Sequence, residues 1–213
     1  MKKSIYLIAI LALVAVFGFK SSEGEIKTIV VGDDLPSQSV SLMATDDKSY
    51  TLVDLKKENG LLVIFSCNTC PFVVGGKDSE GWEGRYNGIF EAATDNKIGM
   101  ILVNSNAAKR DGGDSMADMK KRAKKSDLKA TYVLDAASVV ADSFGARTTP
   151  HVFLFDEDLA LVYAGAIDDN VGKASEVKEH WLKSALTKVG KGERVDPAQT
   201  RQKGCSIKRV KIE

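Results

Sequence analysis

The stretch LLVIFSCNTCPFV, residues 61–73, joins an apolar run to a pair of closely spaced cysteines. The run from Leu61 to Phe65 has the length and composition of a fully buried strand. A strand that ends in C-x-x-C and opens a helix places Cys67 at the helix N-terminus, where free N–H groups stabilise a thiolate. Two intervening residues let Cys70 reach back to disulfide distance. The stretch therefore predicts a strand-to-helix turn with a redox-active cysteine pair.

Two other uses of the pair have to be weighed. A purely structural disulfide gains most by closing a long loop, and this one would close the shortest practical loop, so redox use explains the spacing better. C-x-x-C is also half of a zinc site, and Cys67, Cys70, Cys205 and His151 are candidate ligands for copper or zinc. The redox interpretation is favoured, and no metal or cofactor is assigned.

Further apolar runs on the C-terminal side have the length of buried strands. They are MILV at 100–103, TYVL at 131–134, VFLF at 152–155 and ALVY at 160–163. Segments with helical spacing of apolar residues lie at 82–90, 116–123 and 174–185. This alternation predicts an α/β layer fold with parallel strands joined by right-handed crossovers.

Two hairpins modify that parallel arrangement. The runs at 152–155 and 160–163 are separated only by acidic residues at 156–158, which predicts a hairpin and hence a mixed sheet. A second hairpin is predicted upstream, turning at Asp46 and Asp47. The 213 residues suit one domain, and 30 Lys and Arg against 29 Asp and Glu leave a formal charge of +1. Nothing in that balance attracts nucleic acid, so no nucleic-acid partner is expected.

The N-terminus has the layout of a secretory signal. MKKS is followed by uninterrupted apolar residues from Ile5 to Phe19 and then by a polar segment, a run that is short for a membrane span. Residues 1–24 are interpreted as a signal peptide or an uncleaved N-terminal anchor, the only route by which the chain would meet a membrane. We therefore expect an exported protein of the periplasm or cell envelope.

Several ordered motifs resemble those of one known family. IFSCNTCPFV at 64–73, VNSN at 103–106, FGARTTPHVFLFD at 144–156, YAGAIDD at 163–169 and GCSIK at 204–208 are similar to motifs of the thioredoxin-like redoxins. Within that group the chain resembles alkyl hydroperoxide reductase or thiol-specific antioxidant domain proteins with a C-N-x-C-P site. The resemblance implies a thioredoxin-like fold, a mixed central β-sheet flanked by helices, over residues 32–190. Residues 191–213 would form a C-terminal tail that carries Cys205.

The resemblance also implies roles for individual residues. Thr149 and Pro150 match the threonine and cis-proline that lie against the cysteine pair, where the backbone of Thr149 would bind an extended substrate segment. The chain departs from the family at two positions. Leu61 stands where thioredoxins carry a buried acid, so the proton acceptor is not identified. Ile64 stands where peroxiredoxins carry Thr or Ser, which argues against peroxidase activity.

These observations together predict an exported thiol–disulfide oxidoreductase. Cys67 attacks and Cys70 resolves the mixed disulfide, with disulfide-bearing or thiol-bearing client proteins and a thiol electron donor as partners. The alternatives are a thiol peroxidase that uses Cys67 and a metal or copper-delivery module. Cys205 is a candidate third redox thiol, expected to lie near the CNTC turn, and a free cysteine that merely dimerises the protein is the other interpretation.

Overall fold

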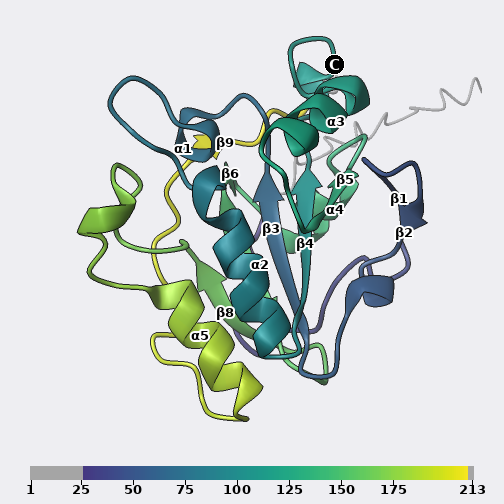
Figure 1. Cartoon of the computed structure of the whole chain (residues 1–213). Coiled ribbons are helices and arrows are strands. Elements are labelled where there is room, and N and C mark those ends of the chain that lie inside the picture. The colour runs from purple at the N-terminus through teal and green to yellow at the C-terminus, as the bar shows by residue number, and fades with distance from the viewer. Residues whose placement is uncertain (1–25, 211–213) are drawn as a thin grey trace, which may run out of the picture.

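The computed structural model describes residues 26–210, so the predicted signal or anchor lies outside the described residues. The chain alternates strands and helices in the order expected from its apolar runs (Figure 1). No helix within this part of the chain has the length and apolar character needed to cross a membrane. The strands are β1 Leu42–Ala44, β2 Ser49–Tyr50, β3 Leu61–Ser66, β4 Gly99–Asn104, β5 Thr131–Leu134, β6 Thr148–Thr149, β7 His151–Phe155, β8 Leu161–Gly165 and β9 Cys205–Ser206. The α-helices are α1 Pro71–Val74, α2 Tyr86–Asp95, α3 Met116–Lys125, α4 Val139–Phe144 and α5 Trp181–Gly190.

The central sheet is mixed, as the two predicted hairpins require. Its strand order is β2-β1-β5-β4-β3-β7-β8, with β3, β4 and β5 parallel. The hairpins β1–β2 and β7–β8 are both antiparallel, and β7 also runs antiparallel to β3. The C-terminal ends of β3, β4 and β5 therefore meet the N-terminal end of β7 at one edge of the sheet. This edge carries the cysteine pair.

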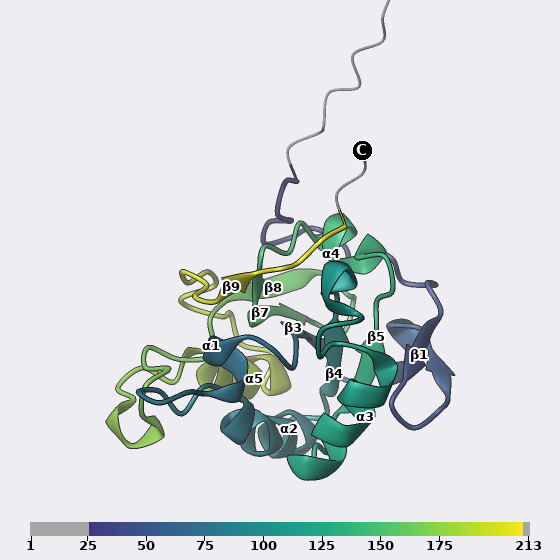
Figure 2. The same ribbon diagram turned by 90° about the horizontal axis from the view of Figure 1, so that it is seen from above.

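Alternation along the central strands divides the core into two layers. Leu62 and Ile64 of β3 face the layer that contains α2, α3 and α5, whereas Val63 and Phe65 face the layer that contains α4. Figure 2, which shows the molecule of Figure 1 from above, has α2, α3 and α5 on one side of the sheet and α4 on the other. Because both faces are covered, β3 is buried throughout, which explains why its sequence is continuously apolar.

The helices differ from the sequence prediction in three places. The helix expected over 82–90 is divided, because residues 83–85 form a 3-10 turn and α2 begins only at Tyr86. The last helix was expected from residue 174, but α5 begins at Trp181, and residues 174–176 form a separate 3-10 turn. The Glu80 carboxylate holds that turn by accepting the Ala174 N–H at 2.7 Å. Helix α4 was not predicted, because six residues are too few to show a helical period. Its Phe144 packs edge-on against Phe65, with the ring centroids 5.1 Å apart.

The C-terminal segment runs back across the domain to the cysteine edge. Thr200 joins it to β8, donating its N–H to the Ala164 carbonyl at 3.0 Å. Further along, β9 pairs antiparallel with β6, and Ile207 is buried in the layer that contains α4. In Figures 1 and 2 the yellow β9 lies beside α1. The segment is therefore fixed against the same edge of the sheet as the CNTC turn.

Candidate redox site

Cys67 and Cys70 lie in the turn after β3, and both are buried, with exposed fractions of 1% and 3%. The prediction that Cys67 occupies the helix N-terminus is wrong. Helix α1 begins at Pro71, and Cys70 is its N-cap. Proline is pre-organised for the first helical position because its φ is fixed and it has no N–H to leave unpaired. Residues 67–69 therefore stay in the turn, and the second cysteine is not the less exposed of the pair.

Thr149 touches both sulfur atoms. Its hydroxyl lies 3.1 Å from Cys67 Sγ, and its carbonyl oxygen accepts a hydrogen bond from Cys70 Sγ at 3.1 Å. The Thr149–Pro150 peptide bond is cis, as the resemblance implied. The antiparallel register that places His151 opposite Phe65 brings this peptide to the end of β3. Whether Thr149 and Pro150 bind substrate stays a prediction.

The two thiols titrate as a coupled pair, because the proton of one stabilises a thiolate on the other. This coupling lowers the pKa of one thiol and, together with burial, raises that of its partner. Cys67 Sγ lies beside the Thr149 hydroxyl, which can donate to a thiolate, whereas Cys70 Sγ donates to the Thr149 carbonyl oxygen and keeps its proton. The hydrogen bonds of Thr149 therefore favour a thiolate on Cys67 and a thiol on Cys70.

Asp114 holds the middle of the CNTC turn. It is fully buried, and its Oδ1 accepts hydrogen bonds from Asn68 N at 2.7 Å and Asn104 Nδ2 at 2.9 Å. Its Oδ2 accepts from Thr69 Oγ1 at 2.7 Å and Asn106 Nδ2 at 3.0 Å. Both carboxylate oxygens already accept two donors, so Asp114 fixes the two residues between the cysteines. Its charge also acts to raise the pKa of Cys67.

Arg110 and Tyr132 complete this buried polar cluster. The Arg110 guanidinium donates to the backbone carbonyls of Asn104 and Asp135 at 2.9 and 2.7 Å, joining the ends of β4 and β5. Tyr132 donates to Asn68 Oδ1 at 3.0 Å. Sequence reasoning missed Asp114, Arg110 and Tyr132 as site residues. The VNSN motif was the available signal, because its asparagines follow a buried strand at the cysteine edge.

Cys205 lies beside the cysteine pair. It faces Thr149 in the β6–β9 pair and packs against the buried cluster that contains Cys67 and Cys70. Burial and the neighbouring Cys70 raise the pKa of Cys205 to about 11. Of the three cysteines it is the one that is partly exposed. The expected location near the CNTC turn is therefore what the structure shows, whereas a redox role is not tested by it.

His151 does not join the cysteines. Its ring packs against Phe153 with centroids 4.4 Å apart, in the layer on the α4 side, and its Nδ1 accepts the Arg147 N–H at 3.3 Å. Cys67 and Cys70 face the opposite layer. Across residues 26–210, no group of three or more His, Cys, Asp or Glu side chains is arranged to hold a metal ion. The metal site considered from the sequence is therefore not formed by these residues.

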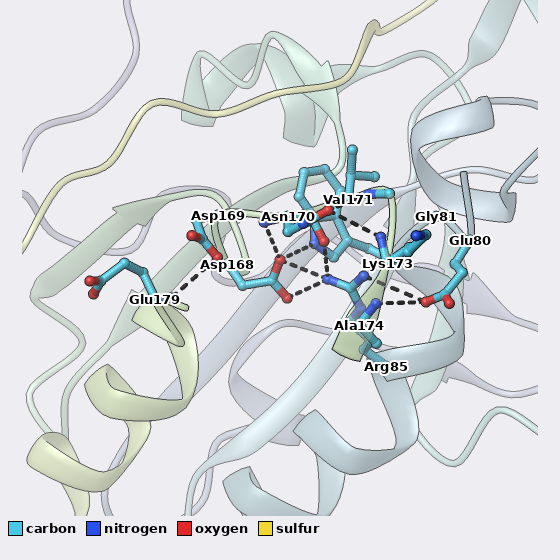
Figure 3. Close-up of polar contacts among 12 residues, drawn as sticks. Glu80, Gly81, Arg85, Asp168, Asp169, Asn170, Val171, Lys173, Ala174 and Glu179 are labelled. Atoms are coloured by element: carbon cyan, nitrogen blue, oxygen red, sulfur yellow. Dashed lines mark hydrogen bonds and ion pairs between the residues drawn. The ribbon is translucent and has the colours of Figure 1, made fainter. Parts of the chain in front are cut away.

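An ion pair fastens the loops beside the site. Arg85 Nη1 contacts both carboxylate oxygens of Asp168, at 2.7 and 2.6 Å, and also donates to the Asn170 carbonyl at 2.7 Å. Trp82 Nε1 donates to the same carboxylate at 2.8 Å. Figure 3 shows Arg85 reaching between Asp168 and Glu80. The pair thereby joins the segment after α1 to the loop after β8.

A groove of about 560 Å³ runs past these loops to the C-terminal segment. Aromatic rings and charges of both signs line it, including Phe72, Trp82, Thr148, Asp168, Trp181 and Arg201. Because Phe72 follows the CNTC turn and Thr148 precedes Thr149, the groove opens beside the cysteine pair. Another hollow, of about 420 Å³, lies around Asp156 at the opposite end of the sheet, away from this chemistry.

Comparisons with known proteins agree with this geometry. An uncharacterized conserved protein from Geobacillus kaustophilus is 27% identical, with a TM-score of 0.76 over 86% of this chain and 94% of that one. A hypothetical protein from Sinorhizobium meliloti 1021 is 28% identical, with a TM-score of 0.73 over 86% and 97%. A putative protein disulfide isomerase from Bacteroides thetaiotaomicron shares the fold, at 15% identity and a TM-score of 0.54 over 78% and 91%. No curated protein sequence matches the chain.

The mixed sheet, the cysteine turn and the adjoining cis-proline define a thioredoxin-like redox protein. Residues 30–180 match the family model described as Redoxin. The chain belongs to the Redoxin family, and the thioredoxin-like fold expected from the sequence is confirmed.

Proposed function

We propose that this protein is an exported thiol–disulfide oxidoreductase whose Cys67 and Cys70 exchange disulfides with client proteins. The observation that carries the proposal is the contact of both sulfurs with Thr149 beside a cis-proline, at 3.1 Å each. The adjoining groove offers room for a client segment. A dithiol donor returns the pair to its reduced form after each turnover.

Cys67 is the sulfur that attacks in this proposal. Its thiolate forms a bond to one sulfur of the client disulfide, and the other client sulfur leaves as a thiolate. Cys70 then loses its proton and attacks Cys67 Sγ, which releases the second client thiol and leaves a 67–70 disulfide. The client gains two electrons, and the cysteine pair loses two. The contacts of Thr149 support this order, because its hydroxyl can donate to Cys67 Sγ and its carbonyl oxygen accepts from Cys70 Sγ.

The test uses variants in a Cys205→Ser background, so that only the pair reacts. With dithiothreitol as donor and a small aromatic disulfide as substrate, Cys70→Ser should lose multiple turnover and accumulate a mixed disulfide on Cys67. Cys67→Ser should lose turnover without trapping substrate. Trapping by Cys67→Ser alone would reverse the assignment. Unchanged exchange rates in both variants would disprove the oxidoreductase function.

Export rests on the sequence of residues 1–19, a basic start followed by an apolar run. We expect the full-length chain to appear outside the cytoplasm, either cleaved after Phe19 or held by an N-terminal anchor. Cell fractionation with N-terminal sequencing measures both. Recovery of the intact N-terminus in the soluble cytosol would contradict export and leave the exchange chemistry untouched.

A further inference from the structure

The C-terminal segment pairs with the edge of β6, where the resemblance implies that the backbone of Thr149 binds an extended client segment. Cys205 is directly opposite Thr149, and Ser206 is opposite Thr148, in an antiparallel pair. Gly204 passes so close that an added Cβ would lie 2.3 Å from the Thr149 carbonyl oxygen. An extended chain with a cysteine next to the residue before the cis-proline is the arrangement that β-strand addition gives to a bound peptide.

Several contacts hold Cys205 in this place. Ile207 N–H donates to the Arg147 carbonyl at 3.0 Å, and the Ile207 side chain is buried. Lys208 accepts the Ala108 N–H at 2.8 Å and donates its own N–H to Asn106 Oδ1 at 2.9 Å. These contacts follow Cys205 directly in the chain. Its thiol is therefore positioned by the fold, unlike a cysteine on a free chain end.

Cys70 has both other cysteines as neighbours. Its sulfur donates to the Thr149 carbonyl oxygen, and Cys205 is paired with Thr149 from the adjoining strand. Cys205 also packs against the buried cluster that contains Cys67 and Cys70. A disulfide on Cys70 therefore has two partners within the same chain.

We propose that Cys205 is a third redox-active residue, which exchanges with the 67–70 disulfide to form a 70–205 disulfide. This inference rests on the proposed function, because client reduction supplies the 67–70 disulfide. In the exchange the Cys205 thiolate attacks Cys70 Sγ, the 70–205 bond forms and the 67–70 bond breaks. Cys67 leaves with the electron pair and takes up the proton that Cys205 gave up. The number of thiols stays constant, so no further oxidant is required.

The 70–205 disulfide would change which part of the site is open. It ties β9 over Thr149, so a client cannot pair with that edge until a donor reduces the bond. It also frees Cys67 as a thiol. The C-terminal segment thereby acts as an internal client, and the protein has a resting oxidised form distinct from the 67–70 form.

The experiment maps disulfides in the full chain after oxidation with oxidised glutathione, alkylation of free thiols and non-reducing peptide mass spectrometry. The wild type should contain both 67–70 and 70–205 links. Cys67→Ser should lose both of its free thiols to a 70–205 link within one chain, and Cys205→Ser should contain only the 67–70 link. The matched control is Ser206→Cys in the Cys205→Ser background, which moves the thiol to the neighbouring exposed position. It should form no link to Cys70.

Two results would overturn the inference. One is a Cys205 that stays alkylatable in oxidised wild type and in Cys67→Ser, or that links only two chains. The other is an equal yield of links from the control position, which would indicate a loose tail. Wild-type mapping does not depend on any variant folding. Failure of the proposed function is distinguishable, because it would appear as unchanged substrate turnover in the cysteine-pair variants, whichever links are mapped.

Discussion

Cys205 lies directly opposite Thr149 in the antiparallel pair of β6 and β9, and the Thr149 carbonyl oxygen accepts a hydrogen bond from Cys70. One residue beside the cis-proline therefore joins the cysteine pair to the C-terminal segment. Cys205 packs against the cluster that contains Cys67 and Cys70, so β9 contributes to the burial of both cysteines. The geometry leads to four predictions, two of which concern the site itself.

Replacing Gly204 by alanine should loosen β9. The added Cβ would meet the Thr149 carbonyl oxygen at 2.3 Å, which the backbone must move to relieve. We expect a loss of about 1–3 kcal/mol in the free energy of unfolding and faster alkylation of Cys67 and Cys70. Thiol labelling kinetics followed by peptide mapping measures the second effect. Gly84→Ala is the control, because no atom lies within 4 Å of its added Cβ; equal labelling in both variants would show that β9 does not cover the pair.

Replacing Asp114 by asparagine should disorder the CNTC turn. The amide cannot accept from both of the donors that now share Oδ2, Thr69 Oγ1 at 2.7 Å and Asn106 Nδ2 at 3.0 Å. We expect a loss of about 1–3 kcal/mol in stability and a fall of about tenfold or more in kcat for disulfide exchange.

The same substitution carries a readout that a purely structural role would not move. Removing the Asp114 charge should lower the pKa of Cys67, because that charge helps to raise it. The pH dependence of Cys67 alkylation in Asp114→Asn, compared with the wild type, measures this shift. Asp111→Asn, at an exposed position nearby, should leave the profile unchanged. An unshifted Cys67 profile in Asp114→Asn would contradict the assigned coupling.

Breaking the Arg85–Asp168 pair should destabilise the loops that flank the groove. Both side chains are largely buried, and Arg85 Nη1 lies 2.6 Å from Asp168 Oδ2. Removing one charge of a buried pair leaves the other uncompensated, so Asp168→Asn should cost about 3 kcal/mol. Urea unfolding measures the loss. Glu176→Gln breaks the exposed pair with Lys173 and should cost less than about 1 kcal/mol; a similar cost for both would show that burial of the first pair adds nothing.

His151 should make the protein less stable in mild acid. Burial, with a smaller contribution from Arg147, lowers the pKa of His151 from 6.5 to about 3 in the folded state. Between these pH values the unfolded chain binds a proton at His151 that the folded chain does not. The free energy of unfolding should therefore fall as pH decreases through this range, by as much as about 1.4 kcal/mol per pH unit.

Urea unfolding at several pH values tests this sign. His151→Gln should flatten the pH dependence between pH 6.5 and 4, because the titrating group is gone. His180→Gln, at an exposed histidine, should leave the slope as it is in the wild type. A wild-type slope that survives in His151→Gln would assign the acid sensitivity to other groups.

The sequence by itself determined the main strands of the central sheet and the two hairpins that make it mixed, but not the short β6–β9 pair. Continuous apolar runs such as 61–65 and 152–155 are typical of strands that are covered on both faces. A short acidic turn between two such runs is long enough only for a hairpin. The C-x-x-C spacing and the TTP motif located the candidate site for the same reason, since each is a local pattern. The short α4 and the start of α5 had no such pattern.

Only the tertiary structure decided how the site is assembled. Asp114, Arg110 and Tyr132 are distant from the cysteines in the sequence and meet them because the ends of parallel strands converge at one edge of the sheet. The position of Cys205 beside the CNTC turn depends on the pairing of β9 with β6, which the C-terminal segment reaches only after a long return path. A residue pattern encodes local conformation, whereas proton sharing and access depend on distances between segments that only folding brings together.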